Sequence, residues 1–178
     1  MPRLRRAVVA ALVAVGVLAC SGCVDLAEMQ FVKDHRLQFT APDAYELVEL
    51  PLEVTWTMED FEVLDRSEKA EPTDAAGYYA VFVDRAPVKP GRTLADVGDG
   101  DPQCEDNPRC TSKDYLAAAG VYTTRKPSIT LSLVNPLSSK ARIQLHQVTV
   151  VLLDSEGRRI GEHAWFRQFK LENKVLDQ

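Results

Sequence analysis

The stretch HQVTVVLLDSEGRRIGEHAWFRQF, residues 146–169, has the pattern of a β-hairpin. Its two halves are rich in Val, Leu, Ile and aromatic residues, which favour strands. Between them, Asp154 to Gly157 suit a type I turn with the glycine in the left-handed position, followed by a bulge. This stretch therefore predicts two long antiparallel strands that meet at Gly157.

Pairing the residues on either side of this turn sets the register of the hairpin. Side chains alternate between the two faces of a strand, so Leu152 is expected opposite Ile160 and His146 opposite Phe166. In this register His146 and His163 lie on opposite faces of the hairpin. We expect one histidine at the edge of the core and the other at the surface.

Short apolar runs separated by proline, glycine and aspartate continue this pattern upstream. A helical pattern occurs at 111–119, where Thr111 as N-cap and Asp114 three residues later suit a capping box and Gly120 suits a stop. Trp56 and Phe82 are the expected core members. The sequence predicts a mainly β, single antiparallel β-sandwich of about seven strands, at residues 37–40, 50–58, 77–84, 121–124, 128–133, 143–153 and 159–171.

Two of these runs resemble parts of a known family. The hairpin resembles the closing strands of bacterial immunoglobulin-like modules of the fibronectin type III and PKD kind, Y-x-V-x-L-x-V-x-D-x-x-G, with His146 where those families place tyrosine. The stretch LEVTW, residues 52–56, is similar to the tryptophan-bearing early strand of a fibronectin type III module. The resemblance covers about half of the chain beyond residue 19. It implies an Ig-like sandwich and no particular function.

The first 19 residues have the pattern of an export signal. Arg3, Arg5 and Arg6 precede the apolar run Ala7–Ala19, and no acidic residue occurs before Asp25. The run has 13 residues, whereas a membrane-spanning helix needs about 20. We therefore expect a signal peptide at 1–19 and not a permanent transmembrane segment.

The residues that end this signal resemble the lipobox of bacterial lipoproteins: Val17-Leu18-Ala19-Cys20. The resemblance implies that Cys20 receives a diacylglyceryl group and becomes the first residue of the mature chain. Cys23 is the alternative, because Ser21-Gly22 also supply small residues, and an ordinary secretory signal is a third possibility. Two or more acyl chains anchor a protein stably. We expect a protein lipid-anchored to the extracytoplasmic face of a bacterial membrane.

The other cysteines are interpreted in the light of export. Outside the cytoplasm, two cysteines close together in the chain usually form a disulfide. Cys104 and Cys110 are therefore expected to bond to each other, which leaves Cys23 without a predicted partner in the chain. A zinc site would need two further ligands at suitable spacing. His35, His146 and His163 do not supply them in a recognisable pattern.

Residues 86–119 interrupt the strand pattern and are too long for an ordinary connection. We expect an insertion at one end of the sandwich and, if the domain binds a partner, the binding region. Five acidic residues crowd within it beside two glycines, a composition that suits calcium, although the spacing is not that of an EF-hand. A solvated acidic loop is the alternative. The possible cation-binding residues are Asp96, Asp99, Asp101, Glu105 and Asp106.

The length and the net charge of the mature chain limit the functions that it can have. Without its signal the chain has 159 residues, divided into a lipidated N-terminus and tether at 20–36 and one domain at 37–178. Of the 21 basic residues 18 remain against 26 acidic ones, a net charge near −8. Nucleic acid is a poor partner for such a field.

Catalytic motifs do not stand out in the sequence. We therefore expect a non-catalytic binding or interaction module of the cell envelope, whose partner is an envelope protein or polymer. The alternative is a small extracytoplasmic enzyme, or an enzyme subunit, that uses a carboxylate or calcium site in the 96–106 loop.

Overall fold

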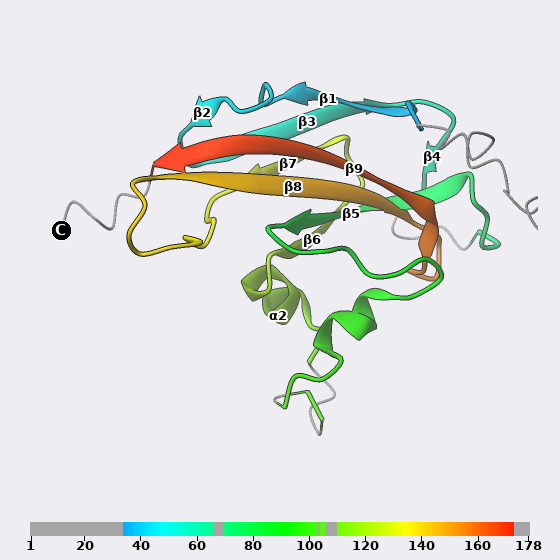
Figure 1. Cartoon of the computed structure of the whole chain (residues 1–178). Coiled ribbons are helices and arrows are strands. Elements are labelled where there is room, and N and C mark those ends of the chain that lie inside the picture. The colour runs from blue at the N-terminus through cyan, green and yellow to red at the C-terminus, as the bar shows by residue number, and fades with distance from the viewer. Residues whose placement is uncertain (1–33, 66–69, 103, 106–109, 173–178) are drawn as a thin grey trace, which may run out of the picture. The chain divides into compact units, whose positions relative to one another are not determined.

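The computed structural model describes residues 34–65, 70–102, 104–105 and 110–172 (Figure 1). Cys20, Cys23 and Asp106 lie outside the described residues. The protein is mainly β, as predicted, and its strands form two sheets. The smaller sheet is antiparallel with the order β1-β3-β7, and its strands are β1 (Leu37–Ala41), β3 (Leu52–Met58) and β7 (Ser128–Leu131).

The larger sheet has the order β2-β9-β8-β5-β4, and β6 pairs with β5. Its long strands are antiparallel, whereas β2 pairs with β9 and β4 with β5 in parallel. The short β2 and β4 escaped prediction because two residues cannot show alternation. The strands of this sheet are β2 (Leu47–Val48), β4 (Glu62–Val63), β5 (Ala76–Val83), β6 (Val121–Thr124), β8 (Ile143–Leu153) and β9 (Arg159–Glu172).

The main core lies between the two sheets. Trp56 of β3 is buried, as predicted, and packs edge-on against Tyr79 of β5, with ring centroids 5.3 Å apart. Val54 and Leu52 alternate with exposed residues along β3 and join the same cluster. On the facing sheet Val81, Val150 and Phe169 complete it. The alternation that predicted the strands thus also identified the face that each strand buries.

A second apolar cluster covers the opposite face of the larger sheet. Phe82 is fully buried there with Val121 and Val151, and Val97 of the insertion packs against them. In Figure 1, residues 94–98 and helix α2 (Lys113–Ala118) lie beside β5 and β6, on the side away from β1 and β3. The described residues 88–97 and 115–119 of the insertion therefore contribute to covering a sheet face, where an addition at one end of the sandwich was expected. The cause is β5, which is apolar on both faces.

The hairpin turn has the predicted geometry. The Asp154 N–H donates to the Arg158 carbonyl at 2.9 Å, and the Asp154 carboxylate accepts from the N–H groups of Glu156 and Arg158 at 2.9 Å each. Gly157 has φ of 81°, a left-handed conformation that glycine adopts without a steric penalty. Leu152 faces Ile160, as predicted.

Beyond this point the predicted register is wrong. The ladder shifts between Leu152 and Val150, and Val150 pairs with Trp165. Residues 161–164 of β9 form a bulge. Gly161 has φ of 62°, which lets the strand bend, and the buried Arg159 side chain donates to the carbonyls of Glu162 and His163 at 2.7 and 3.2 Å.

The bulge changes the partner of His146, which lies opposite Phe169 and not Phe166. Phe169 is fully buried and its ring stacks on the imidazole, with centroids 5.9 Å apart. Phe166 is 60% exposed. The physical reason is the bulge, which adds residues to β9 but not to β8. Beyond the bulge, each residue of β8 therefore pairs with a β9 residue three positions later than expected.

The predicted helix is present but shorter. α2 begins one residue later than expected, because Ser112 and not Thr111 is its N-cap, accepting from the Tyr115 N–H at 3.3 Å. A full capping box occurs instead at Thr93 and Asp96, which begin a 3-10 helix at Leu94–Gly98. Within the described residues, neither helix approaches the length and apolarity that crossing a membrane requires.

Candidate functional site

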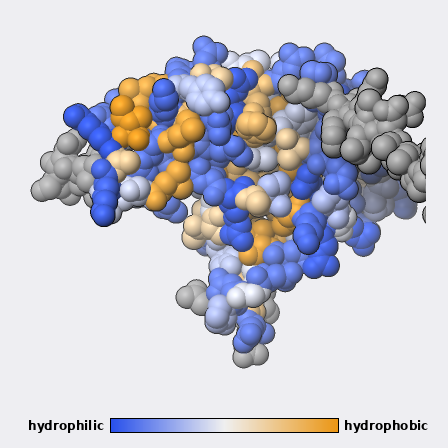
Figure 2. Space-filling model, in the orientation of Figure 1, coloured by the Kyte–Doolittle hydropathy of each residue, from blue (hydrophilic) through white to orange (hydrophobic). Residues whose placement is uncertain are grey.

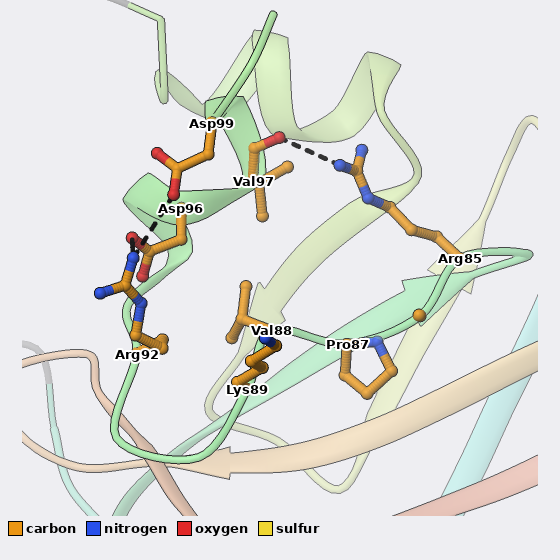
Figure 3. A pocket seen from close by; sticks show the side chains of 9 residues that line it. Arg85, Pro87, Val88, Lys89, Arg92, Asp96, Val97 and Asp99 are labelled. Carbon is orange, nitrogen blue, oxygen red and sulfur yellow. Dashed lines mark hydrogen bonds and ion pairs between the residues drawn. The ribbon is translucent and has the colours of Figure 1, made fainter.

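The insertion encloses a hollow of about 500 Å³ between residues 85–92 and the 3-10 helix. Figure 3 shows Arg85 and Arg92 on opposite sides of it, with Pro87 to Lys89 between them. The Arg85 guanidinium donates to the Val97 carbonyl at 3.0 Å. Lys89 is exposed at the rim. The hollow therefore combines an apolar floor with hydrogen-bonding side chains at its edge.

A buried arginine fixes this hollow to the hairpin. Arg159 is 8% exposed and donates to the Val88 carbonyl at 2.6 Å, in addition to its bonds within the bulge. Burial lowers the pKa of Arg159 from its usual value. The insertion, the bulge and the sheet are thus joined through one guanidinium, and the hollow is held in shape before any ligand arrives.

The far part of the insertion is held by the predicted disulfide. Cys104 and Cys110 are bonded, with their Cα atoms 5.1 Å apart. Gly98 makes room for the bond, because a Cβ atom at this position would lie 2.8 Å from the Cys104 sulfur. The disulfide prediction is confirmed.

Breaking the disulfide is expected to destabilise the protein. Because the bond closes a loop of seven residues, the chain-entropy relation gives about 2 kcal/mol for the double change Cys104→Ala and Cys110→Ala. Urea unfolding measures the loss. Reductant should lower the stability of the natural protein to that of the double variant and leave the variant unchanged. Equal stability of all forms would contradict the expectation.

The predicted cation-binding residues divide into separate interactions. Asp96 and Asp99 both pair with the Arg92 guanidinium, at 2.9 and 3.4 Å. The second Asp96 oxygen accepts from the Thr93 N–H at 2.9 Å, which completes the capping box. These two carboxylates therefore have local partners, an arginine and a helix start.

The other predicted ligands lie elsewhere. Asp101 accepts from the Tyr115 hydroxyl at 2.8 Å, and this hydrogen bond raises the pKa of Tyr115 above its usual value. Glu105 is exposed, and Asp106 falls outside the described residues. Among the residues that the structure describes, no three His, Cys, Asp or Glu side chains gather closely enough to hold a metal ion. The calcium site stays a prediction.

A second hollow, which we call the end groove, lies where β9 ends and β8 begins. It has a volume of about 500 Å³. Figure 2 shows apolar surface at this end of the molecule, around β2 and the end of β9. Sequence patterns did not indicate the groove, because its walls come from four separate segments. The aliphatic residues that line it are Leu47, Val48, Leu50, Leu133, Val134 and Leu171.

A histidine at the floor of the end groove pairs with an aspartate that does not itself line the groove. His146 is 2% exposed, and its Nδ1 lies 2.6 Å from the Asp84 carboxylate. The other Asp84 oxygen accepts from the Gln147 N–H at 2.8 Å. Asp84 directly follows β5, whose last residue, Val83, pairs with Val148. The pairing of β5 with β8 thus brings together residues 62 positions apart.

The two hairpin histidines occupy different environments, as predicted. His146 is buried beside Asp84, whereas the His163 side chain is 47% exposed and lies 3.6 Å from Asp34. Trp165 stacks on the His163 ring and donates its indole N–H to the Asp34 carbonyl at 2.9 Å. His163 belongs to the surface and His146 to the floor of the end groove.

These features define a class of protein: a two-sheet, mainly β domain with a disulfide-bearing insertion over one sheet and an apolar groove at one end. Comparison of the chain with protein-family models, with curated proteins and with solved structures finds no match.

Proposed function

We propose that this protein is a lipid-anchored, extracytoplasmic protein of a bacterial cell envelope, and that its sandwich is a non-catalytic binding module. The observation that carries the proposal is the disulfide between Cys104 and Cys110. Such bonds form and persist in oxidising compartments and are rare in the cytosol. The disulfide therefore supports export, which the arginines, the apolar run and Cys20 of the N-terminal stretch predict independently.

The hollow of the insertion is the proposed contact surface for an envelope protein or polymer. Arg85, Lys89 and Arg92 supply hydrogen-bond donors along its edge, and Pro87 and Val88 supply apolar floor. The bonds of Arg159 and the capping box hold these elements in place. A surface ordered before binding loses less conformational entropy on association, so this arrangement suits recognition.

The anchor is tested by changing each N-terminal cysteine. Cys20→Ser removes the thiol that accepts the lipid, and we expect the protein to leave the membrane fraction. Cys23→Ser is the matched control and should stay in that fraction, because acylation at Cys20 is unaffected. Immunoblots of washed membranes measure both. Loss of membrane binding in Cys23→Ser alone would overturn the assignment to Cys20.

The contact surface is tested by photo-cross-linking in living cells. A photoreactive amino acid at position 89 is expected to form a discrete adduct with an envelope component. The control is position 53, because Glu53 is exposed on the smaller sheet, far from the insertion in the chain. Adducts of equal yield from both positions, or from position 53 alone, would contradict binding by the insertion.

A further inference from the structure

The end groove exposes apolar side chains that a folded domain ordinarily buries. Leu47 is 56% exposed, Leu133 68% and Leu50 37%, and all three line the groove. A contiguous exposed apolar surface marks a site of interaction. The volume of about 500 Å³ falls in the range of small-molecule sites, about 300–1,000 Å³. The walls therefore suit an aliphatic ligand.

The floor of the groove offers one ring nitrogen. Because the Asp84 carboxylate is the acceptor in this short contact, Nδ1–H donates to it, and Nε2 is the ring nitrogen that remains for a ligand. None of the hydrogen bonds among the described residues uses Nε2. The ring stacks on Phe169 and lines the groove, so its orientation is fixed. His146 thus presents one polar ring nitrogen within an apolar site.

Gln144, the neighbouring polar side chain in the groove, is fully engaged. Its carbonyl oxygen accepts from the N–H groups of Leu137 and Ser138, and its amide nitrogen donates to the carbonyls of Ser138 and Ala141. Gln144 therefore holds the loop at residues 137–141 in place. Because these bonds engage its amide, His146 is the polar side chain that we expect to contact the ligand.

The cost of removing a charged group from water selects the head group. Glu49 and Glu172 line the groove, and Glu172 pairs with Arg142 at 2.8 Å. A carboxylate or phosphate head would lose its hydration in a mostly apolar site, which is unfavourable. An uncharged hydroxyl can form a hydrogen bond with Nε2 at no such cost.

We propose that the end groove binds a free, single-chain aliphatic molecule whose head group is an uncharged hydroxyl, the class of fatty alcohols and monoacylglycerols. The hydroxyl forms a hydrogen bond with His146 Nε2, and the chain lies against Leu47, Leu50 and Leu133. This ligand site is separate from the insertion and goes beyond the proposed function.

The experiment uses the whole protein in its own membranes and photoactivatable probes with a ten-carbon chain. The probes are a decanol, the matching decanoate and a two-chain phospholipid carrying the same photoreactive group. After irradiation, mass spectrometry identifies the labelled residues. We expect the decanol to label groove residues, and the decanoate and the phospholipid to label them weakly.

Two variants separate the walls from the head-group contact. Leu133→Asp changes an exposed wall residue and should reduce decanol labelling by about tenfold or more, because it places a charge against the chain. Phe166→Asp is its matched control, an exposed apolar residue outside the groove, and should leave labelling unchanged. His146→Phe keeps a ring without Nε2 and should abolish the preference for decanol over decanoate.

Three results would overturn the proposal. Labelling that Leu133→Asp leaves unchanged would place the ligand outside the groove. Decanoate labelling equal to that of decanol in the natural protein would refute the head-group assignment. Equal labelling by the phospholipid would mean that the groove docks on the bilayer and does not take a free chain.

Discussion

Replacing Phe169 with alanine is expected to lower the free energy of unfolding by about 3–5 kcal/mol, the usual cost of truncating a buried phenylalanine. Phe169 is fully buried in the main core and stacks on His146. Its removal leaves a cavity between the two sheets and takes away the support of the imidazole. Urea unfolding measures the loss of stability. We also expect the His146 ring to be less well ordered, because it loses its stacking partner.

The matched control lies three residues earlier on the same strand. Phe166→Ala removes the same atoms from a side chain that is 60% exposed, so we expect a change within about 0.5 kcal/mol. The pair of variants tests the register of β8 and β9 directly. Without the bulge, Phe166 would lie opposite His146. A large effect of Phe166→Ala and a small one of Phe169→Ala would contradict the shifted register.

Replacing Gly77 with alanine is expected to destabilise the protein by at least about 3 kcal/mol, at the upper end of overpacking effects. A Cβ atom at this position would lie 1.8 Å from the Leu153 carbonyl oxygen and 3.0 Å from the Asp154 Cα. Both are backbone atoms of the central hairpin and cannot rotate away. The substitution must therefore separate β5 from β8, next to the turn that joins β8 and β9.

Gly91→Ala is the control, because it measures the cost of replacing a glycine where the added Cβ atom causes no clash. Gly91 has φ of 72°, and nothing lies within 4 Å of a Cβ atom built there. The substitution should cost about 1–2 kcal/mol, the penalty of a left-handed conformation for alanine. Thermal unfolding of both variants measures the difference. If Gly77→Ala were no more destabilised than Gly91→Ala, the close approach of β5 to β8 would be refuted.

Local sequence determined much of the fold. The turn at Asp154 to Gly157 was predictable because its hydrogen bonds join residues within five positions. The disulfide was predictable for the same reason, since Cys104 and Cys110 are six residues apart. Alternation also located the long strands to within a few residues. Such features depend on neighbours in the chain, which the sequence displays directly.

The register of β9 depends on the bulge, which local and distant contacts both hold. The Arg159 guanidinium donates to the nearby carbonyls of Glu162 and His163, but it also reaches Val88 of the insertion, 71 positions away, and the sequence does not show that contact. The position of the insertion has a similar cause. It covers a sheet face because β5 buries Phe82 on one side and Tyr79 on the other, and only the assembled sheet shows that both sides need a cover.

The end groove was hidden for a related reason. Asp84 and His146 approach through the pairing of β5 with β8, and Leu47 and Leu133 reach the groove from two further segments. Each of these residues has an ordinary sequence context. The acidic loop is the opposite case: five acidic residues are conspicuous in the sequence, yet Asp96, Asp99 and Asp101 have local structural partners. Proximity in the chain made the acidic cluster conspicuous, whereas the residues of the end groove are far apart in the chain.

The proposed function depends first on a lipid attached to Cys20. Intact-mass spectrometry, with and without thiol alkylation, of the protein extracted from its own membranes tests this attachment. We expect a chain that begins at an acylated Cys20, with Cys104 bonded to Cys110 and Cys23 open to alkylation. A chain in which Cys20 carries no acyl group would refute the proposed anchor.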